Sequence, residues 1–347
     1  MTPRFVALLA LLASPVAADE IQTCPVDAKP VVSLGFGSRY TDDSANRTDF
    51  DEEADKAVTA ALKPVDDFIA DLARQTNIVN DPDASRERAG TAAACVMDSV
   101  LVWARADALS DLSTQGAKLS APSRVGGIAF AYAAALKVLP QPEGQDEIEA
   151  WLLARAQQTM AFFDTEAPPR ASQNNLRAWA GLAVTRVGLT LDDPSLIDWG
   201  AETLRLVACT AKPDGSLPNE MWRGKLALHY QLHAVAPLVT TAALLQDERP
   251  ELFTVCDRAL ARIVRFTLSA LEDPSAVERI TGEKQTLGGT RKARDFELAW
   301  VPAYLTLDPD AEVAAGLDRI KEPGNSKLGG DQRLLWPGPK AADPADG

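Results

Sequence analysis

Two short stretches decide how the rest of this chain is interpreted: SQNNLRAW at residues 172–179 and LPNEMWRGKLALHYQLH at residues 217–233. In the second stretch, Arg223 and Tyr230 are seven residues apart, so on a continuous helix they would project from one face. A cation and a phenol on one face suit chemistry on a carboxylated substrate. The only two histidines of the chain, His229 and His233, fall in the same stretch. We therefore expect a functional site here.

The sequence around these stretches has the apolar periodicity of successive helices. In residues 54–73 the apolar positions recur at i, i+3 and i+4, and Pro64 predicts a kink or a second helix start. Further helices are expected at 89–109, 126–139, 146–163, 174–187, 195–209, 219–245, 252–271 and 296–305. The best strand candidate, 31–36, is short. This helix–loop–helix rhythm favours an all-α fold, an α/α toroid, with a helical bundle or a short helical solenoid as alternatives.

Both ends of the chain differ from this helical body. Arg4 precedes a short apolar run at 5–13, and small residues precede a predicted cut before Asp19, so residues 1–18 are typical of a secretory signal peptide. The apolar run is too short to span a bilayer. The tail 337–347 is rich in Pro, Ala and Asp, and we expect it to be disordered. We thus expect one domain, 19–336, in an exported, periplasmic protein without membrane insertion.

The net charge of −14 excludes a general nucleic-acid-binding protein. It would also repel a polyanion at long range, so an acidic substrate would need a locally positive region. The cations that could form one are Arg39, Arg223, Lys225, Arg291, Lys292, Arg294 and Lys327, although each could equally be solvated surface charge. We expect no cofactor and no metal, because two histidines without a neighbouring carboxylate are a poor site and no phosphate-binding or dinucleotide-binding glycine motif occurs.

The two stretches resemble the alginate lyases of polysaccharide lyase family 5. Those enzymes carry Asn-Asn-His with a Trp three residues after the His, then Leu-Pro-Asn-Glu and an Arg seven residues before a Tyr. The residues here that match this pattern are Asn174, Asn175, Trp179, Arg223 and Tyr230. Weaker matches run in the family's order from about Cys24 to about Trp336. The resemblance implies an incomplete α/α toroid with a deep cleft, an acidic polysaccharide as partner, and a Cys24–Cys95 disulfide. Cys209 and Cys256 could be paired or free.

A lyase that cleaves a uronate polymer by β-elimination must neutralise the carboxylate, remove the C5 proton and protonate O4. The resemblance implies Asn175 and Arg223 for the first task and Tyr230 for the third. The family's catalytic His, however, is Leu176 here. Three alternatives follow: Tyr230 is both base and acid, His233 is the base, or the site binds sugar without catalysis.

The remaining candidates are residues that could contact the sugar: Asn174, Arg177, Trp179, Arg39, Tyr40, Trp300 and Lys327. Simpler explanations compete with these roles. Asn174 could only cap a helix, and Arg223 could pair with Glu220 on a helix surface. The tryptophans and Tyr230 could be core aromatics. By helical geometry His229 would point about 100° away from Tyr230. We therefore expect an exported, monomeric polysaccharide lyase, or alternatively a non-catalytic protein that binds an anionic polysaccharide in an exopolysaccharide system.

Overall fold

The computed structural model describes residues 24, 28–310, 313–314 and 320–337. The expected signal peptide 1–18, and all of the expected tail except Pro337, lie outside these residues. The long helices are α1 Glu52–Asn80, α2 Arg86–Arg105, α3 Gln115–Leu136, α4 Gln145–Thr165, α5 Asn175–Leu191, α6 Pro194–Ala208, α8 Ala227–Leu244 and α9 Val255–Glu272. Short helices are α7 Pro218–Met221, α10 Ser275–Thr281, α11 Val301–Leu307 and α13 Gln332–Leu335.

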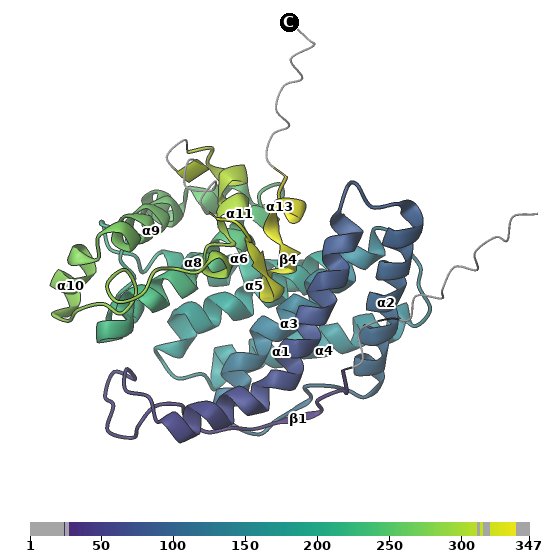
Figure 1. The fold of residues 1–347 in the computed structure, drawn as a ribbon, viewed down its shortest axis with the longest axis horizontal. Helices are drawn as coiled ribbons and strands as arrows, with labels where there is room; N and C mark the ends of the chain where they lie inside the picture. The colour runs from purple at the N-terminus through teal and green to yellow at the C-terminus, as the bar shows by residue number, and fades with distance from the viewer. Residues whose placement is uncertain (1–23, 25–27, 311–312, 315–319, 338–347) are drawn as a thin grey trace, which may run out of the picture.

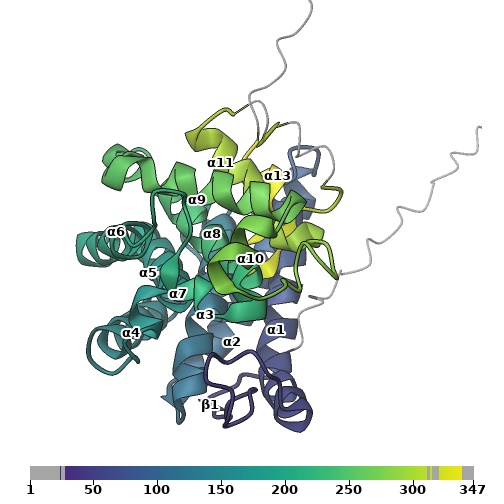
Figure 2. The same cartoon turned by 90° about the vertical axis from the view of Figure 1, so that its left-hand side faces the viewer.

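The helices are arranged as an incomplete α/α toroid, as expected. Along its inner side α1 packs against α3, α3 against α5, and α5 against α8, while α2, α4, α6 and α9 each contact the inner helix that precedes them in the chain. Figures 1 and 2 show this progression from α1 and α2 to α9 and α10. Helices α3, α5 and α8 are apolar nearly all round, because they are covered on most sides.

The C-terminal part of the described chain returns to the N-terminal helices. The hairpin of β3 Gly324–Asn325 and β4 Gly330–Asp331, with the short helix η5 Ser326–Leu328 between its strands, contacts α1 and α3. The main-chain N–H of Asp331 donates to Asn77 Oδ1 on α1 at 2.7 Å. Figure 1 shows β4 beside α1 and α3. This return brings Lys327 next to the inner helices.

Several predicted boundaries need correction. Pro64 does not start a second helix, since α1 runs through it. Helix α3 begins eleven residues earlier than predicted, at Gln115. The predicted helix 219–245 is wrong: it is divided into α7, the 3-10 turn η2 Gly224–Leu226, and α8. The predicted strand is reduced to β1 Ser33–Leu34, which pairs in parallel with β2 Asp111–Leu112.

Two disulfides tie the fold together. The expected Cys24–Cys95 bond is present and joins the N-terminal segment to α2. Cys209 and Cys256, whose state the sequence left open, also form a disulfide, which links the end of α6 to the beginning of α9. No helix among the described residues is long and apolar enough to cross a membrane.

Candidate active site

The break between α7 and α8 determines where Arg223 lies. Gly224 has a φ of +50°, and a Cβ at that position would come 2.3 Å from the Glu283 carboxylate, so the turn favours glycine. Arg223 and Tyr230 therefore do not share one helix, and the predicted geometry of two helical turns is wrong. The turn nevertheless places the Arg223 guanidinium over the Tyr230 ring, with Cζ 3.6 Å from the ring centroid. This is a close cation–π contact.

Arg223 is held by the N-terminal segment. Its Nε donates to the carbonyl of Asn46 at 3.1 Å, and its Nη2 donates to the carbonyl of Arg47. The residue is 7% exposed, and Glu220 is 0% exposed. The simpler explanation of an exposed Arg223–Glu220 pair is therefore wrong. Arg223 is a buried cation fixed by two carbonyls beside a phenol.

The Tyr230 hydroxyl is hydrogen-bonded to the Tyr40 hydroxyl, which comes from the same N-terminal segment. The Arg223 Cζ lies 5.1 Å from the Tyr40 ring centroid, so the one cation contacts both phenols. Burial raises the pKa of Tyr230, the neighbouring Tyr40 raises it further, and Arg223 opposes them. Tyr230 is thus a protonated phenol at neutral pH and can act as a proton donor.

Asn175, the first residue of α5, is bound to the buried Glu220. Its main-chain N–H donates to Glu220 Oε1 at 2.7 Å, and its Nδ2 lies 3.2 and 3.0 Å from the two carboxylate oxygens. Its Oδ1 is buried without a hydrogen-bond partner among the described residues. Burial raises the pKa of Glu220 to about 7, although the hydrogen bonds from Asn175 act to lower it. Glu220 therefore fixes the amide whose role in carboxylate binding the resemblance implied.

His233 lies on α8 against Trp179 of α5, with 5.3 Å between the ring centroids. Burial, and then the charge of Lys327, hold the pKa of His233 well below its ordinary value, so the imidazole is neutral at neutral pH. Leu176, at the family's His position, is one turn before Trp179 and packs partly buried against the apolar cluster that contains Phe162 and Phe163. The imidazole of His233, on α8, therefore contacts α5 at Trp179, one turn after the position where the family pattern has its His.

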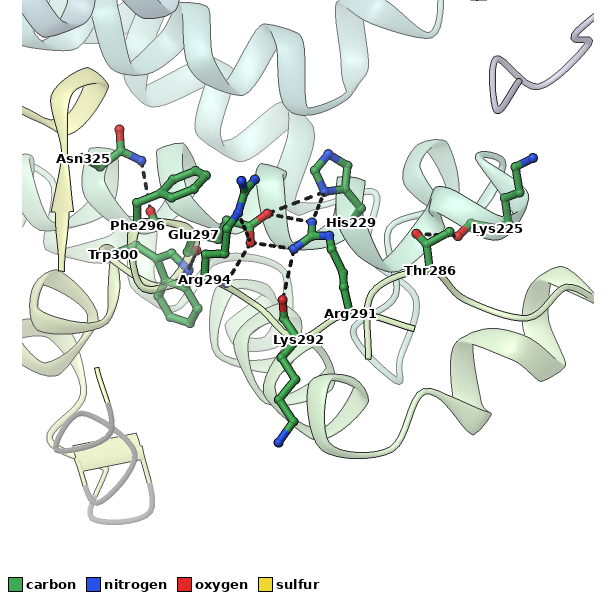
Figure 3. A network of polar contacts seen from close by, with 10 residues as sticks. All are labelled: Lys225, His229, Thr286, Arg291, Lys292, Arg294, Phe296, Glu297, Trp300 and Asn325. Atoms are coloured by element: carbon green, nitrogen blue, oxygen red, sulfur yellow. Dashed lines mark hydrogen bonds and ion pairs between the residues drawn. The ribbon is translucent and has the colours of Figure 1, made fainter. Parts of the chain in front are cut away.

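His229 also belongs to this group, which the helical geometry of the sequence did not predict. Its ring meets the Tyr230 ring edge-on at 4.9 Å and lies parallel to the His233 ring at 6.3 Å. Figure 3 shows Arg291 and Glu297 beside each other, each joined to His229 by a dashed line. Arg291 Nη2 lies 3.1 Å from His229 Nδ1, and the two Arg291 amino groups each donate to Glu297 at 2.8 Å. The spacing His-x-x-x-His, which puts both rings on one face of α8, is the sequence signal that could have predicted this group.

Lys327 lies beside Arg124 of α3. Burial lowers the pKa of Lys327 to about 7, and the charge of Arg124 lowers it further. Arg124 is bound by Asp66 of α1 at 2.9 Å. The charge of Arg39 also acts on Lys327, although Arg39 itself is paired with Asp55 at 2.9 Å. Because Arg124 and Arg39 are each paired with an aspartate, the locally positive region that the sequence required stays a prediction.

Other predicted sugar-binding residues lie elsewhere or serve the fold. Arg177 is buried and donates to Asp164, Thr203 and the carbonyl of Phe163, so it stabilises the fold, and its predicted contact with the sugar stays a prediction. Trp300 is 0% exposed, with Nε1 bonded to the carbonyl of Glu297, so it is a core aromatic rather than a stacking surface. Asn174 caps α5 through the main-chain N–H of Leu176. Trp179 is nearly buried, although its Nε1 has no partner among the described residues.

A cavity of about 650 Å³ lies near Arg223. Its lining residues include Asn46 and Gly224, which also surround Arg223, together with Trp222 and Glu283. Among the described residues, no three His, Cys, Asp or Glu side chains gather in a way that could hold a metal ion.

Comparison with known proteins agrees with this geometry. The Alginate lyase family model matches residues 124–277, which contain both key stretches. A polysaccharide lyase of Stenotrophomonas maltophilia is 29% identical, covering 96% of this chain and 95% of its own length. An alginate lyase of Azotobacter chroococcum is 28% identical over 91% of this chain and 85% of that one, and an alginate lyase of Pseudomonas aeruginosa is 27% identical over 89% and 84%.

Solved structures share the fold. The crystal structure of alginate lyase A1-III from Sphingomonas species A1 matches with a TM-score of 0.68 and 21% identity, over 91% of this chain and 87% of that one. A variant of the same lyase complexed with a tetrasaccharide matches with a TM-score of 0.73 and 20% identity, over 94% and 89%. The solved structures show the fold, and the matched family model together with the relatives that cover nearly the whole chain shows a polysaccharide lyase that is similar to the alginate lyases.

Proposed function

We propose that this protein is exported and cleaves a uronate-containing polysaccharide, polymannuronate or a polyglucuronate-like polymer, by β-elimination. The observation that carries the proposal is the Arg223–Tyr230–Tyr40 group, in which a buried cation is fixed against two hydrogen-bonded phenols. Two disulfides are typical of proteins in an oxidising compartment, which supports export to the periplasm.

In the proposed reaction, Arg223 and Asn175 stabilise the charge that builds on the uronate carboxylate as the C5 proton leaves. The electrons of the C5–H bond form the C4–C5 double bond, and the C4–O4 bond breaks. The Tyr230 phenol gives its proton to O4. The phenol then regains a proton, ultimately the one taken from C5, through the base and solvent.

For the base we propose His233. It follows Tyr230 by three residues on α8, and both rings contact His229, so the two groups lie on one side of the helix. The neutral imidazole has a lone pair available, whereas Tyr230 would have to ionise first, against its raised pKa. Leu176 cannot accept a proton, and His233 supplies the missing function from the neighbouring helix.

The test is ultraviolet absorbance of the mature protein with polymannuronate, polyguluronate, polyglucuronate and a galacturonan. A rise from the new C4–C5 double bond on one of them is the expected result. Tyr230→Phe should abolish the rise and keep the unfolding midpoint, while Tyr304→Phe, a buried tyrosine far along the chain, should keep activity. A flat trace on every polymer, with binding retained, would overturn the proposed reaction and favour the non-catalytic alternative.

His233→Gln separates the two possible bases. If His233 takes the proton, this variant should lose about 100-fold or more in kcat, the usual contribution of a positioned base. If Tyr230 takes it, His233→Gln should retain kcat within a few-fold. Activity of the wild type should persist below pH 6.5, the ordinary imidazole pKa, because the pKa of His233 is lowered.

A further inference from the structure

His229 contacts Tyr230, but the proposed reaction does not use it. Its side chain is 34% exposed, so a bound molecule could reach it. Its ring is fixed from three directions: by the edge of Tyr230, by the parallel ring of His233, and by Arg291 at Nδ1. A histidine that only faced solvent would not need three contacts to hold its ring in one orientation.

The contact with Arg291 decides which nitrogen of His229 carries the proton. A guanidinium has donors only, so Nδ1, at 3.1 Å from Arg291 Nη2, must be the acceptor. In the neutral ring the proton is then on Nε2. Arg291 cannot turn away easily, because both of its amino groups are bound to Glu297 and one also donates to the carbonyl of Lys292. Figure 3 shows the second ring nitrogen of His229 pointing away from Arg291 and Glu297.

The charges around His229 favour an anionic or strongly accepting partner for that nitrogen. Arg223, Arg291 and Arg294 all act on the ring, while Glu297 is occupied by hydrogen bonds from Arg291 and from the main chain of Arg294. Tyr230 and His233, the neighbours on α8, are uncharged at neutral pH. Burial lowers the pKa of His229 to about 4, so the ring itself stays neutral in spite of Glu297.

We propose that the Glu297–Arg291 pair fixes His229 as a hydrogen-bond donor, whose Nε2–H binds a carboxylate or hydroxyl oxygen of the acidic sugar beside Tyr230. His229 is then a substrate-orienting residue and cannot be the base, since its only lone pair is used by Arg291. Arg291 and Glu297 act through it as positioning residues. This inference rests on the proposed function for the identity of the ligand, but the state of the ring can be tested independently.

The first test is the tautomer in the free protein. Because the chain has only two histidines, a long-range proton–nitrogen spectrum of tag-free protein labelled at histidine contains two imidazoles, and His233→Gln assigns them. The expected result is an Nε2–H tautomer for His229 with no titration above pH 5. In Arg291→Gln, Glu297 becomes the acceptor for an Nδ1–H, so the tautomer should switch and the pKa should rise. An Nδ1–H tautomer in the wild type would overturn the proposal.

Arg294→Gln is the matched control. It removes an equal charge that also contacts Glu297, with Nε 3.5 Å from Oε2, but it leaves the contact at Nδ1 intact. The tautomer should therefore not change in this variant. If the tautomer also switched in Arg294→Gln, the local charge, rather than the contact with Arg291, would determine which nitrogen of His229 carries the proton.

The second test is the KM for oligomannuronate. Arg291→Gln should raise KM about tenfold at pH 8, the usual effect of losing a charge-assisted hydrogen bond, and KM should recover as the pH falls and His229 gains a second proton. His229→Gln, whose amide nitrogen can approach the Nε2 position, should retain more affinity than His229→Asn. Equal, wild-type KM values in all three variants would overturn the donor role.

A third measurement separates this inference from the proposed reaction. In Tyr230→Phe, saturating tetramannuronate should shift the Nε2–H signal of His229 although no turnover occurs. A protein that cleaves no polymer but shows this shift would contradict the β-elimination and support the donor. Cleavage by the wild type, without any shift of the His229 signal in Tyr230→Phe, would support the β-elimination and contradict the donor role of His229.

Discussion

At the scale of single residues, Glu220 occupies the most unusual environment in the site. It is a fully buried carboxyl without an ion pair among the described residues, and its hydrogen bonds come from Asn175. Burying an acid without a paired cation costs free energy, which the folded protein reduces by keeping the proton. The cost is tolerated at a position that fixes the amide of Asn175, so the arrangement favours function over stability.

This gives a pH-dependent prediction for Glu220→Gln. The pKa of Glu220 rises from 4.5 to about 7 on folding. Below pH 4.5 both states hold the proton, but between 4.5 and 7 the unfolded state releases it first, so the free energy of unfolding falls as the pH rises. At about 1.36 kcal/mol per unit the loss is on the order of 3 kcal/mol. Urea denaturation at pH 5 and pH 8 should show this loss in the wild type and a smaller one in the variant. Equal losses of unfolding free energy in the wild type and in Glu220→Gln would show that Glu220 does not titrate between pH 5 and pH 8.

At this scale the sequence paired residues that are in contact in the structure, partly for the wrong reason. Arg223 and Tyr230 were paired because of an expected shared helix face, yet they meet through the turn at Gly224. His229 was judged to point away, yet its ring contacts Tyr230. Spacing along a helix predicts directions only where the helix is continuous, and aromatic rings are long enough to reach neighbours at i+1. Glu297 and Arg291 could not be linked to His229, because no local pattern spans roughly sixty residues.

At the scale of helices, the contact between α5 and α6 depends on missing side chains. Gly200 of α6 faces Thr185 of α5, and a Cβ at Gly200 would lie 1.9 Å from Thr185 Oγ1 and 3.1 Å from its Cβ. Thr185 is fully buried, so its hydroxyl can rotate only by moving its methyl group into packed atoms. The two helices can approach so closely because the sequence has glycine there.

Gly200→Ala should therefore destabilise the protein by about 1–3 kcal/mol, the usual cost of overpacking. Gly90→Ala is the matched control: Gly90 is also a helical glycine, in α2, but no atom lies within 4 Å of the place that a Cβ would take, so alanine should stabilise the protein by about 0.5–1 kcal/mol. Denaturant midpoints of both variants measure this difference. Two variants of equal stability would show that α6 can shift to accept the methyl group.

Helices of this fold could be predicted because each buries a long apolar stripe, as in α1, where Val58, Leu62, Val65 and Ile69 are buried. The interruption of the helix after Met221 could not be predicted. Residues 219–245 are apolar enough for one helix, and Gly224 is the main local signal of a turn. What breaks the helix there is tertiary: Glu283 accepts from the main-chain N–H of Lys225, and Arg223 is held by the N-terminal segment.

At the scale of the whole molecule, the site is assembled from distant parts of the chain. Tyr40 comes from the N-terminal segment, Asn175 from α5, Tyr230 from α8 and Lys327 from the C-terminal hairpin. The disulfides fix the first of these segments to α2 and join α6 to α9. This site, which includes the buried cation Arg223, lies in a chain whose net charge is −14.

This charge distribution predicts a maximum in the dependence of kcat/KM on salt. At 10 mM salt the Debye length is about 30 Å, so the whole acidic body repels a polyuronate; at 150 mM it is about 8 Å, and the charge of the nearby Arg223 dominates. The kcat/KM for polymannuronate should therefore rise about twofold or more between these concentrations, and fall towards 1 M as the local attraction is screened. Trimannuronate, with fewer charges outside the site, should show a smaller rise. A steady fall from the lowest salt for both substrates would mean that the local cations outweigh the acidic surface even at long range.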